Sequence, residues 1–180
     1  VLTAEQTAGR GRKGNLWWSS AGALTFSLVL RSQELPLSPE RRPLAAIAAG
    51  MAVRDALLET APDHEFQLKW PNDVLIENRK VAGLLVTSVP PDGFVIGIGV
   101  NTLMSADQLP VESATSLLAA GVPATVLAPE ALLSACLLQL AEVWSDFVSD
   151  GGDGTEHLLR EYIQYCSTIG RNVVVHLPDG

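Results

Sequence analysis

Short apolar stretches separated by turn-forming residues fill the middle of the chain and constrain its fold more than any other feature. Four of them are expected strands: residues 66–70, 74–76, 81–89 and 94–100. Alternating or β-rich runs bounded by turn residues are typical of strands. The connections at 77–79 and 91–93 are too short for the crossover that parallel strands need. The sequence therefore predicts an antiparallel meander and argues against an alternating βαβ sheet.

Helical periodicity appears on both sides of this meander. Pro43 suits the first turn of a helix, where its missing N–H costs little, and apolar residues then recur at helical spacing to Leu58. Residues 114–120 are expected to form a short helix with Thr115 or Ser116 as its cap. Small side chains in the first helix would let it lie close to the sheet.

The clearest helix is expected at residues 130–148, where apolar side chains recur every three or four positions. Its predicted apolar stripe is Leu133, Cys136, Leu137, Leu140, Trp144 and Phe147. Thr155 is a candidate cap for a further helix that reaches Tyr165. With another alternating strand at 24–30, the predicted class is α+β, a mostly antiparallel mixed sheet packed by helices.

Length and charge narrow the function classes. The chain has 180 residues, 47% of them hydrophobic, and a formal net charge of −8 at pH 7. This length suggests one domain, or one domain with a small appendage. The negative charge opposes non-specific binding to nucleic acid or an anionic membrane. No uninterrupted apolar run reaches the roughly 18 residues of a membrane span, so neither partner is expected.

Cysteine and histidine show no metal-binding pattern. Cys136 and Cys166 are widely spaced, and none of the three histidines has a histidine partner at three to five positions. We therefore expect no protein-bound metal and no disulfide framework. A reducing compartment, the cytoplasm, is the expected location.

The segment Gly9-Arg10-Gly11-Arg12-Lys13-Gly14 holds three of the twelve basic residues within four positions. It matches G-x-G-x-x-G, but a dinucleotide fingerprint opens a helix, whereas this segment leads into a strand. Glycines let backbone N–H groups approach a ligand closely, and arginines supply forked donors for phosphate or carboxylate. From the residues alone, an anion-binding loop and a solvated basic turn stay equally open.

Lysine is scarce, because Lys13, Lys69 and Lys80 are the only three. Lys69 lies near the end of an expected strand, and Pro71 forces the intervening residue to be extended. A lysine fixed on a stiff strand end is a candidate anion ligand. A flexible solvated charge is the commoner outcome for an exposed lysine, and the sequence leaves both readings open.

Glycines alternate in the last expected strand, at Gly97 and Gly99, and Gly83 lies in the strand before it. Glycine weakens a strand unless another group must come close to the backbone. A ligand groove, a bulge and a closely crossing helix are all compatible with this pattern. The chain shows no Ser-His-Asp set and no carboxylate pair with an obvious role, so charge stabilisation and positioning around an anion are the indicated chemistry.

Five segments, taken in order, resemble the biotin–protein ligases. They are Glu5-Gln6-Thr7-Ala8-Gly9-Arg10-Gly11-Arg12-Lys13-Gly14 with Trp17, Lys69-Trp70-Pro71-Asn72-Asp73, Arg79-Lys80-Val81-Ala82-Gly83-Leu84-Leu85-Val86, Gly97-Ile98-Gly99-Val100-Asn101 and Ala114-Thr115-Ser116-Leu117. The resemblance implies the class II synthetase-like fold of biotin and lipoate ligases. It also implies a catalytic domain over residues 1–168 that lacks its N-terminal part, and the start of a small C-terminal β-domain over 169–180, with a strand at 172–177.

The resemblance further implies an ATP-dependent, AMP-forming ligase. Biotin's carboxylate would attack the α-phosphate of MgATP to give biotinyl-5′-AMP and pyrophosphate, and a lysine of a biotin carboxyl carrier protein would then attack the adenylate. Lys69 and Arg12 are the implied catalytic residues, with Lys69 bridging the carboxylate and the α-phosphate and Asn101 meeting the adenine. The implied substrate-binding residues are Gln6, Gly9, Arg10, Gly11, Trp17, Gly83, Gly97 and Asn101.

Other readings stay open beside this one. Thr87 follows Leu85-Val86 at a position where the resembled family often has an acidic residue. The family's Ser-Thr contacts to biotin would precede Val1. A lipoate or octanoate ligase of the same fold, a biotinyl-AMP-binding transcriptional regulator with its DNA-binding domain elsewhere, and an inactive relative are the alternatives. Homodimers are common in the resembled family, so a homodimer is one expected assembly.

Overall fold

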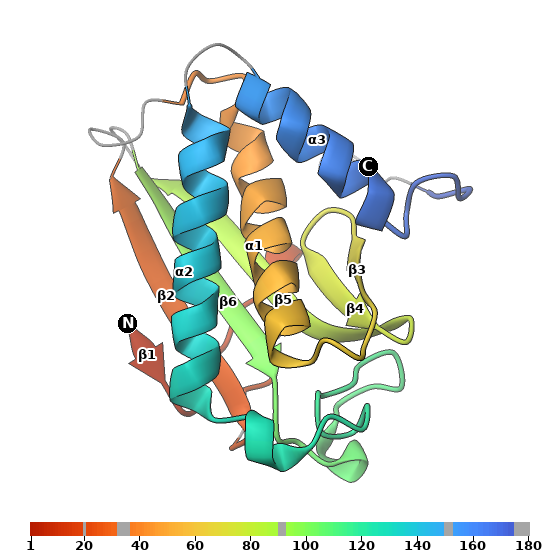
Figure 1. Cartoon of the computed structure of the whole chain (residues 1–180). Helices are drawn as coiled ribbons and strands as arrows, with labels where there is room; N and C mark the ends of the chain where they lie inside the picture. The colour runs from red at the N-terminus through yellow and green to blue at the C-terminus, as the bar shows by residue number, and fades with distance from the viewer. Residues whose placement is uncertain (20, 32–36, 90–92, 150–152, 175–180) are drawn as a thin grey trace.

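The computed structural model describes residues 1–19, 21–31, 37–89, 93–149 and 153–174. Helices α1 and α2 cover one face of a six-stranded sheet, and α3 lies beside them near the sheet edge formed by β3 (Figure 1). The strands are β1 Leu2–Thr3, β2 Ala23–Arg31, β3 Phe66–Lys69, β4 Asp73–Ile76, β5 Arg79–Val89 and β6 Gly93–Asn101. The helices are α1 Ala45–Thr60, α2 Pro129–Val148 and α3 Asp153–Tyr165.

The strand order β1-β2-β6-β5-β4-β3 confirms the predicted meander. Each pair of neighbouring strands is antiparallel, and two isolated parallel bridges join Leu68 to Cys166 and Lys80 to Ala114. The strand predicted at 24–30 is the central part of β2, and it pairs with β6 along its whole length. Residues 91 and 92 of the predicted turn lie outside the described residues.

Alanines explain how α1 packs. A short 3₁₀ turn over Arg42–Leu44 contains Pro43 and leads into the helix, as the proline predicted. The fully or nearly fully buried alanines of this helix are Ala45, Ala48, Ala49, Ala52 and Ala56. Because these side chains are small, α1 can lie close to the sheet, where it contacts β3, β4 and β5.

The apolar stripe predicted for α2 is confirmed at Cys136, Leu140, Trp144 and Phe147. It differs at two positions, because Leu137 is 39% exposed and Leu133 is only partly buried, while Leu132 is buried. The buried stripe is therefore Leu132, Cys136, Leu140, Trp144 and Phe147, at steps of three and four residues on one face. Burial raises the pKa of the Cys136 thiol to about 12, so this cysteine behaves as a small apolar side chain.

One helix of the described residues, α2, is long and apolar enough to cross a membrane by length and composition. Core helices of globular proteins pass the same test, and α2 packs its apolar stripe onto α1 and the core.

Two further local predictions are wrong. Residues 114–120 form turns instead of a helix, because their backbone N–H groups bond to neighbouring segments: Thr115 to Lys80 O and Leu117 to Asn101 O. Ser116 still caps a single turn, since its Oγ accepts the N–H of Ala119 at 2.9 Å. Thr155 does not cap α3, because the helix already begins at Asp153.

The strand predicted at 172–177 is not confirmed. Residues 172–174 have no regular secondary structure, and residues 175–177 lie outside the described residues.

Candidate functional site

A cavity of about 490 Å³ lies on the sheet face turned away from the helices. Phe26, Leu84 and Ile98 pack their side chains into the core, and side chains alternate between the two faces of a strand. The strand residues on the other face that line the cavity are Thr25, Ser27, Gly83, Leu85, Thr87, Val95, Gly97 and Gly99. A volume between roughly 300 and 1,000 Å³ is typical of small-molecule sites.

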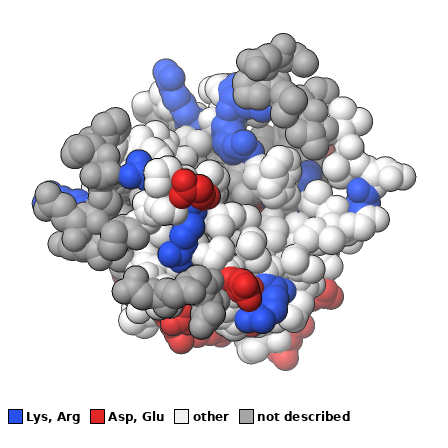
Figure 2. All heavy atoms as spheres, turned by 90° about the horizontal axis from the view of Figure 1, so that it is seen from above, with Lys and Arg blue, Asp and Glu red and all other residues white. Residues whose placement is uncertain are grey.

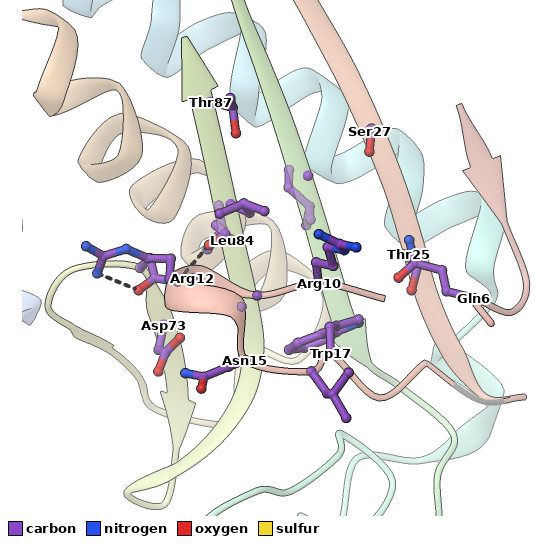
Figure 3. A pocket seen from close by; sticks show the side chains of 18 of the residues that line it. Gln6, Arg10, Arg12, Asn15, Trp17, Thr25, Ser27, Asp73, Leu84 and Thr87 are labelled. Atoms are coloured by element: carbon purple, nitrogen blue, oxygen red, sulfur yellow. Dashed lines mark hydrogen bonds between the residues drawn. The ribbon is translucent and has the colours of Figure 1, made fainter. Parts of the chain in front are cut away.

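The glycine- and arginine-rich loop crosses over this cavity as a small hairpin (Figure 3). Its backbone bonds run from Gly11 N–H to Asn15 O at 2.7 Å and from Trp17 N–H to Gly9 O at 3.0 Å. The chain reverses at Lys13 and Gly14, which have φ angles of 56° and 78°. Arg10 and Arg12 extend from the loop around the cavity (Figure 3). The arrangement favours the anion-binding reading of this segment over a basic turn remote from any pocket.

Gly9 supports the loop without lining the cavity. A Cβ atom at this position would lie 2.8 Å from Gln6 Oε1 and even closer to the carbonyl oxygen of Trp17. Gly9 is therefore needed where the two arms of the hairpin meet, and Gln6 itself lines the cavity.

The glycines of β5 and β6 form a bare surface on which Trp17 rests. Gly83 and Gly99 are directly paired across the two strands. A Cβ at Gly83 would lie 2.9 Å from Trp17 Cζ3, and one at Gly99 would lie 2.7 Å from Trp17 Nε1 and closer still to two ring carbons. The close approach that the glycine pattern predicted is confirmed, and the group that approaches is an indole. Its buried Nε1 has no hydrogen-bond partner among the described residues.

Lys80, at the start of β5, provides the fixed ammonium of the site. Its Nζ lies 2.6 Å from Asp73 Oδ1 and 5.4 Å from the centroid of the Trp17 ring. Its backbone is held by residues 113–115, because Lys80 N–H donates to Ser113 O and Lys80 O accepts from Thr115 N–H, each at 2.8 Å. Sequence reasoning did not select Lys80 as a site residue.

Lys69 is not among the residues that line this cavity, and its predicted role beside Arg12 stays a prediction. The residue ends β3, which forms the edge of the sheet, and β4 separates β3 from β5. Lys69 is exposed at that edge. Strand register aligns Lys69 with Asp73, and Asp73 with Gly83, so the Lys69 side chain lies on the same face of the sheet as the cavity.

The turn after β3 adds two residues that were not predicted as ligands, Asn72 and Asp73. Asn72 Nδ2 donates to Leu84 O at 2.7 Å, and Leu84 N–H donates to Asn72 O at 2.9 Å. Arg12 Nη1 reaches Asn72 Oδ1 at 3.4 Å. The peptide bond between Trp70 and Pro71 in this turn is cis. Both residues lie within the quoted Lys69–Asp73 motif, which was the signal that could have identified them.

Asn101 lies outside the cavity. It is 5% exposed, and its Nδ2 donates to Thr115 O at 2.9 Å. In this structure Asn101 fixes the segment that in turn holds the Lys80 backbone. The predicted binding residues that do line the cavity are Gln6, Arg10, Gly11, Arg12, Trp17, Gly83 and Gly97.

The charge of the cavity is opposite to that of the whole chain. Its charged lining residues are Arg10, Arg12, Lys13, Lys80 and Asp73, against a chain total of −8. The lining includes no cysteine or histidine, and the described residues contain no group of three or more His, Cys, Asp or Glu side chains that could hold a metal. The arrangement can therefore bind and orient anions.

The face of the molecule seen from above is mixed in charge. On it, the described lysine and arginine side chains form separate groups, some of them beside acidic side chains (Figure 2).

Comparison with known proteins agrees with this geometry. The chain is 36% identical over its whole length to a biotin–[acetyl-CoA-carboxylase] ligase of Mycobacterium tuberculosis, of which it spans 65%. It is 40% identical over 62% of its length to the enzyme of the same name from Paracoccus denitrificans, of which it spans 48%. The chain thus spans roughly half to two thirds of these relatives.

Two solved structures share the fold. A biotin protein ligase from Aquifex aeolicus in complex with biotin and ATP has a TM-score of 0.76 and 27% identity, covering 94% of this chain and 68% of that one. The biotin protein ligase from Leishmania major in complex with biotinyl-5-AMP gives 0.77 and 26%, with coverages of 99% and 74%. The sequence profile of one family matches residues 1–101, more than half of the chain. The chain belongs to the Biotin/lipoate A/B protein ligase family.

Proposed function

We propose that the protein is a biotin–protein ligase that activates biotin with ATP and transfers it to a lysine of a carrier protein. The observation that supports this most directly is the cavity, where four cationic side chains and one carboxylate surround a glycine surface that carries no cysteine or histidine. Such a site suits a reaction whose nucleophiles come from the substrates.

In the first step, a carboxylate oxygen of biotin attacks the α-phosphorus of MgATP, and the bond from that phosphorus to the bridging oxygen of pyrophosphate breaks. The products are biotinyl-5′-AMP and pyrophosphate. Two anions must approach each other, so fixed cations lower the barrier by offsetting charge that concentrates in the transition state. We assign Lys69 and Arg12 to this task, and Lys80 supplies a further ammonium that lines the cavity. The loop that carries Arg12 would also limit access of water to the adenylate.

In the second step, the ε-amine of the acceptor lysine attacks the acyl carbon of the adenylate, and AMP leaves. Both bacterial relatives are named as biotin–[acetyl-CoA-carboxylase] ligases, so the proposed acceptor is the biotin carboxyl carrier protein of such an enzyme. Mg²⁺ would arrive with the nucleotide, because Mg²⁺ commonly uses one or two carboxylates together with substrate phosphates and Asp73 is the cavity's carboxylate.

The proposal also covers the domain organisation, the location and the assembly of the protein. Residues 1–168 form the catalytic domain and 169–180 lead into a small β-domain. The two cysteines, Cys136 and Cys166, are unpaired and buried, which fits a cytoplasmic location. A homodimer is the proposed assembly.

Two lysine variants and a matched arginine control test the proposal. Lys80→Met should lower biotin-dependent pyrophosphate release from ATP by about 10²–10³-fold, the scale for losing one preorganised stabilising group. Lys69→Met should lower the same rate by a similar factor, whereas Arg79→Met, whose side chain pairs with Glu77 outside the cavity, should stay within about threefold. A normal rate in Lys69→Met would remove Lys69 from the assignment, and a normal rate in Lys80→Met would remove Lys80. Absence of release in the unaltered protein, or faster turnover of lipoate than of biotin, would overturn the proposed function.

A further inference from the structure

The segment after α3 bonds to the outer edge of β3. Cys166 forms a parallel bridge with Leu68, and Ser167 donates to Leu68 O through both its N–H at 2.7 Å and its Oγ at 3.0 Å. One step further, the backbone N–H of Trp70 donates to Thr168 Oγ1 at 3.0 Å. The bonds of Cys166 and Ser167 with Leu68 cover part of the outer edge of β3. Backbone groups at a sheet edge are otherwise unpaired.

The hydrogen bond from Trp70 to Thr168 lies beyond the end of β3. β3 ends at Lys69, so Trp70 already belongs to the turn that leads to Asn72 and Asp73. Thr168 is only partly buried and contributes no side chain to the hydrophobic core. Its hydroxyl therefore holds the turn and adds little to the packing of the sheet.

Residues that line the cavity hold the other end of the same turn. Asn72 exchanges two hydrogen bonds with Leu84 of β5, and Asp73 pairs with Lys80. Arg12 of the loop also reaches Asn72. The turn thus connects Thr168 on one side with Arg12 and Lys80 on the other.

We propose that Thr168 is a positioning residue for the reaction, because its hydroxyl anchors the 70–73 turn and so sets where Asn72 and Asp73 hold Arg12 and Lys80. This role rests on the proposed function, but the anchoring of the turn is a separate physical statement. Without the anchor the turn gains freedom at Trp70, and the two cations lose their fixed separation. A misplacement of about 1 Å can lower a rate by about 10²-fold even when the altered residue is remote from the chemistry.

Thr168→Val in the intact protein tests the role, since valine keeps the branched shape and removes the acceptor. The kcat for biotin-dependent pyrophosphate release should fall by about 10–100-fold, while KM for biotin stays within about twofold, because the lost interactions act on the transition state. Thr168→Ser keeps an acceptor and should restore kcat to within about threefold. Thr60→Val is the matched control, because the Thr60 hydroxyl bonds to Ala56 O inside α1 at 2.8 Å, remote from the cavity.

Amide hydrogen exchange supplies a readout that does not need activity. Exchange over residues 70–73 should be faster in Thr168→Val than in the unaltered protein and in Thr60→Val. Unchanged kcat or unchanged exchange in a folded Thr168→Val overturns the proposal. If that variant does not fold, Thr168→Cys replaces it, because sulfur is a weak acceptor, and the same outcomes apply. An inactive unaltered protein refutes the proposed function, whereas the exchange result still decides whether Thr168 anchors the turn.

Discussion

Gly99→Ala should release the glycine- and arginine-rich loop without harming the sheet. The added Cβ would lie 2.7 Å from Trp17 Nε1 and closer to two ring carbons, well inside the optimal separation of roughly 3.5–4.0 Å between heavy atoms. The backbone of β6 is held by pairing on both sides, so the indole has to move. Since the indole anchors the end of the hairpin, its displacement should favour open conformations of residues 9–17.

The size of the effect follows from the apolar surface area that the displaced indole no longer buries. A packed tryptophan buries roughly 150–250 Å², and losing half of the smaller figure at about 25 cal/mol per Å² costs about 2 kcal/mol. At about 1.4 kcal/mol for each factor of ten, the open population of the loop should rise roughly 20-fold. Apparent affinity for a ligand that needs the closed loop should fall by up to a similar factor.

Limited trypsin digestion measures that population without any ligand, since the loop contains Arg10, Arg12 and Lys13. When opening and closing are fast, the cleavage rate follows the population of the open form, so Gly99→Ala should be cut roughly 20-fold faster. Gly97→Ala is the matched control, because a Cβ there meets nothing nearer than Leu85 O at 3.6 Å. Equal cleavage rates in the two variants would refute the reasoning. A further increase on adding Gly99→Ala to Trp17→Ala would also refute it, because no indole then remains for the new Cβ to displace.

Two other matched pairs test the helix phase and the loop. Leu132→Ala should lower the free energy of unfolding by about 2–5 kcal/mol and Leu137→Ala by about 0.5 kcal/mol or less, measured by urea denaturation; similar losses would mean that α2 is rotated. Arg12→Ala should speed release of biotinyl-AMP by about 10–100-fold, since charge-assisted hydrogen bonds contribute about 1.5–3 kcal/mol. Arg79→Ala, whose side chain pairs with Glu77 at 3.0 Å outside the cavity, should leave the release rate unchanged, and equal rates in the two arginine variants would exclude Arg12 as a ligand.

Local sequence patterns predicted the strands well because each strand carries its own signal. Alternation and apolar runs identified β2 to β6, and the short turns between residues 66 and 101 gave their antiparallel order. The prediction of a helix at 114–120 was wrong because the structure of this segment depends on distant residues. Its residues are compatible with a helix, but the bonding partners of Thr115 and Leu117 belong to distant parts of the chain, and no local pattern reports them.

Sequence reasoning missed Lys80 as a cavity residue for a similar reason. Lys69 and Lys80 are both near strand ends, and strand alternation alone does not distinguish them. The meander order does, because the strand that holds Lys80 lies beside the glycine strand, whereas Lys69 is two strands further away. The information that separates the two lysines was therefore present in the predicted topology, although not in the spacing of either motif.

The Lys80–Asp73 pair is compatible with the proposed reaction between anions. Asp73 Oδ1 holds the Lys80 ammonium in the cavity at 2.6 Å. The two side chains are 32% and 21% exposed, and a pair that water still reaches contributes only about 0–1 kcal/mol. An incoming carboxylate or phosphate can therefore gain the ammonium as a partner at little cost, while the backbone bonds of Lys80 to Ser113 and Thr115 keep the lysine in place. Asp73 thus holds Lys80 ready without competing strongly with the anions that the reaction brings together.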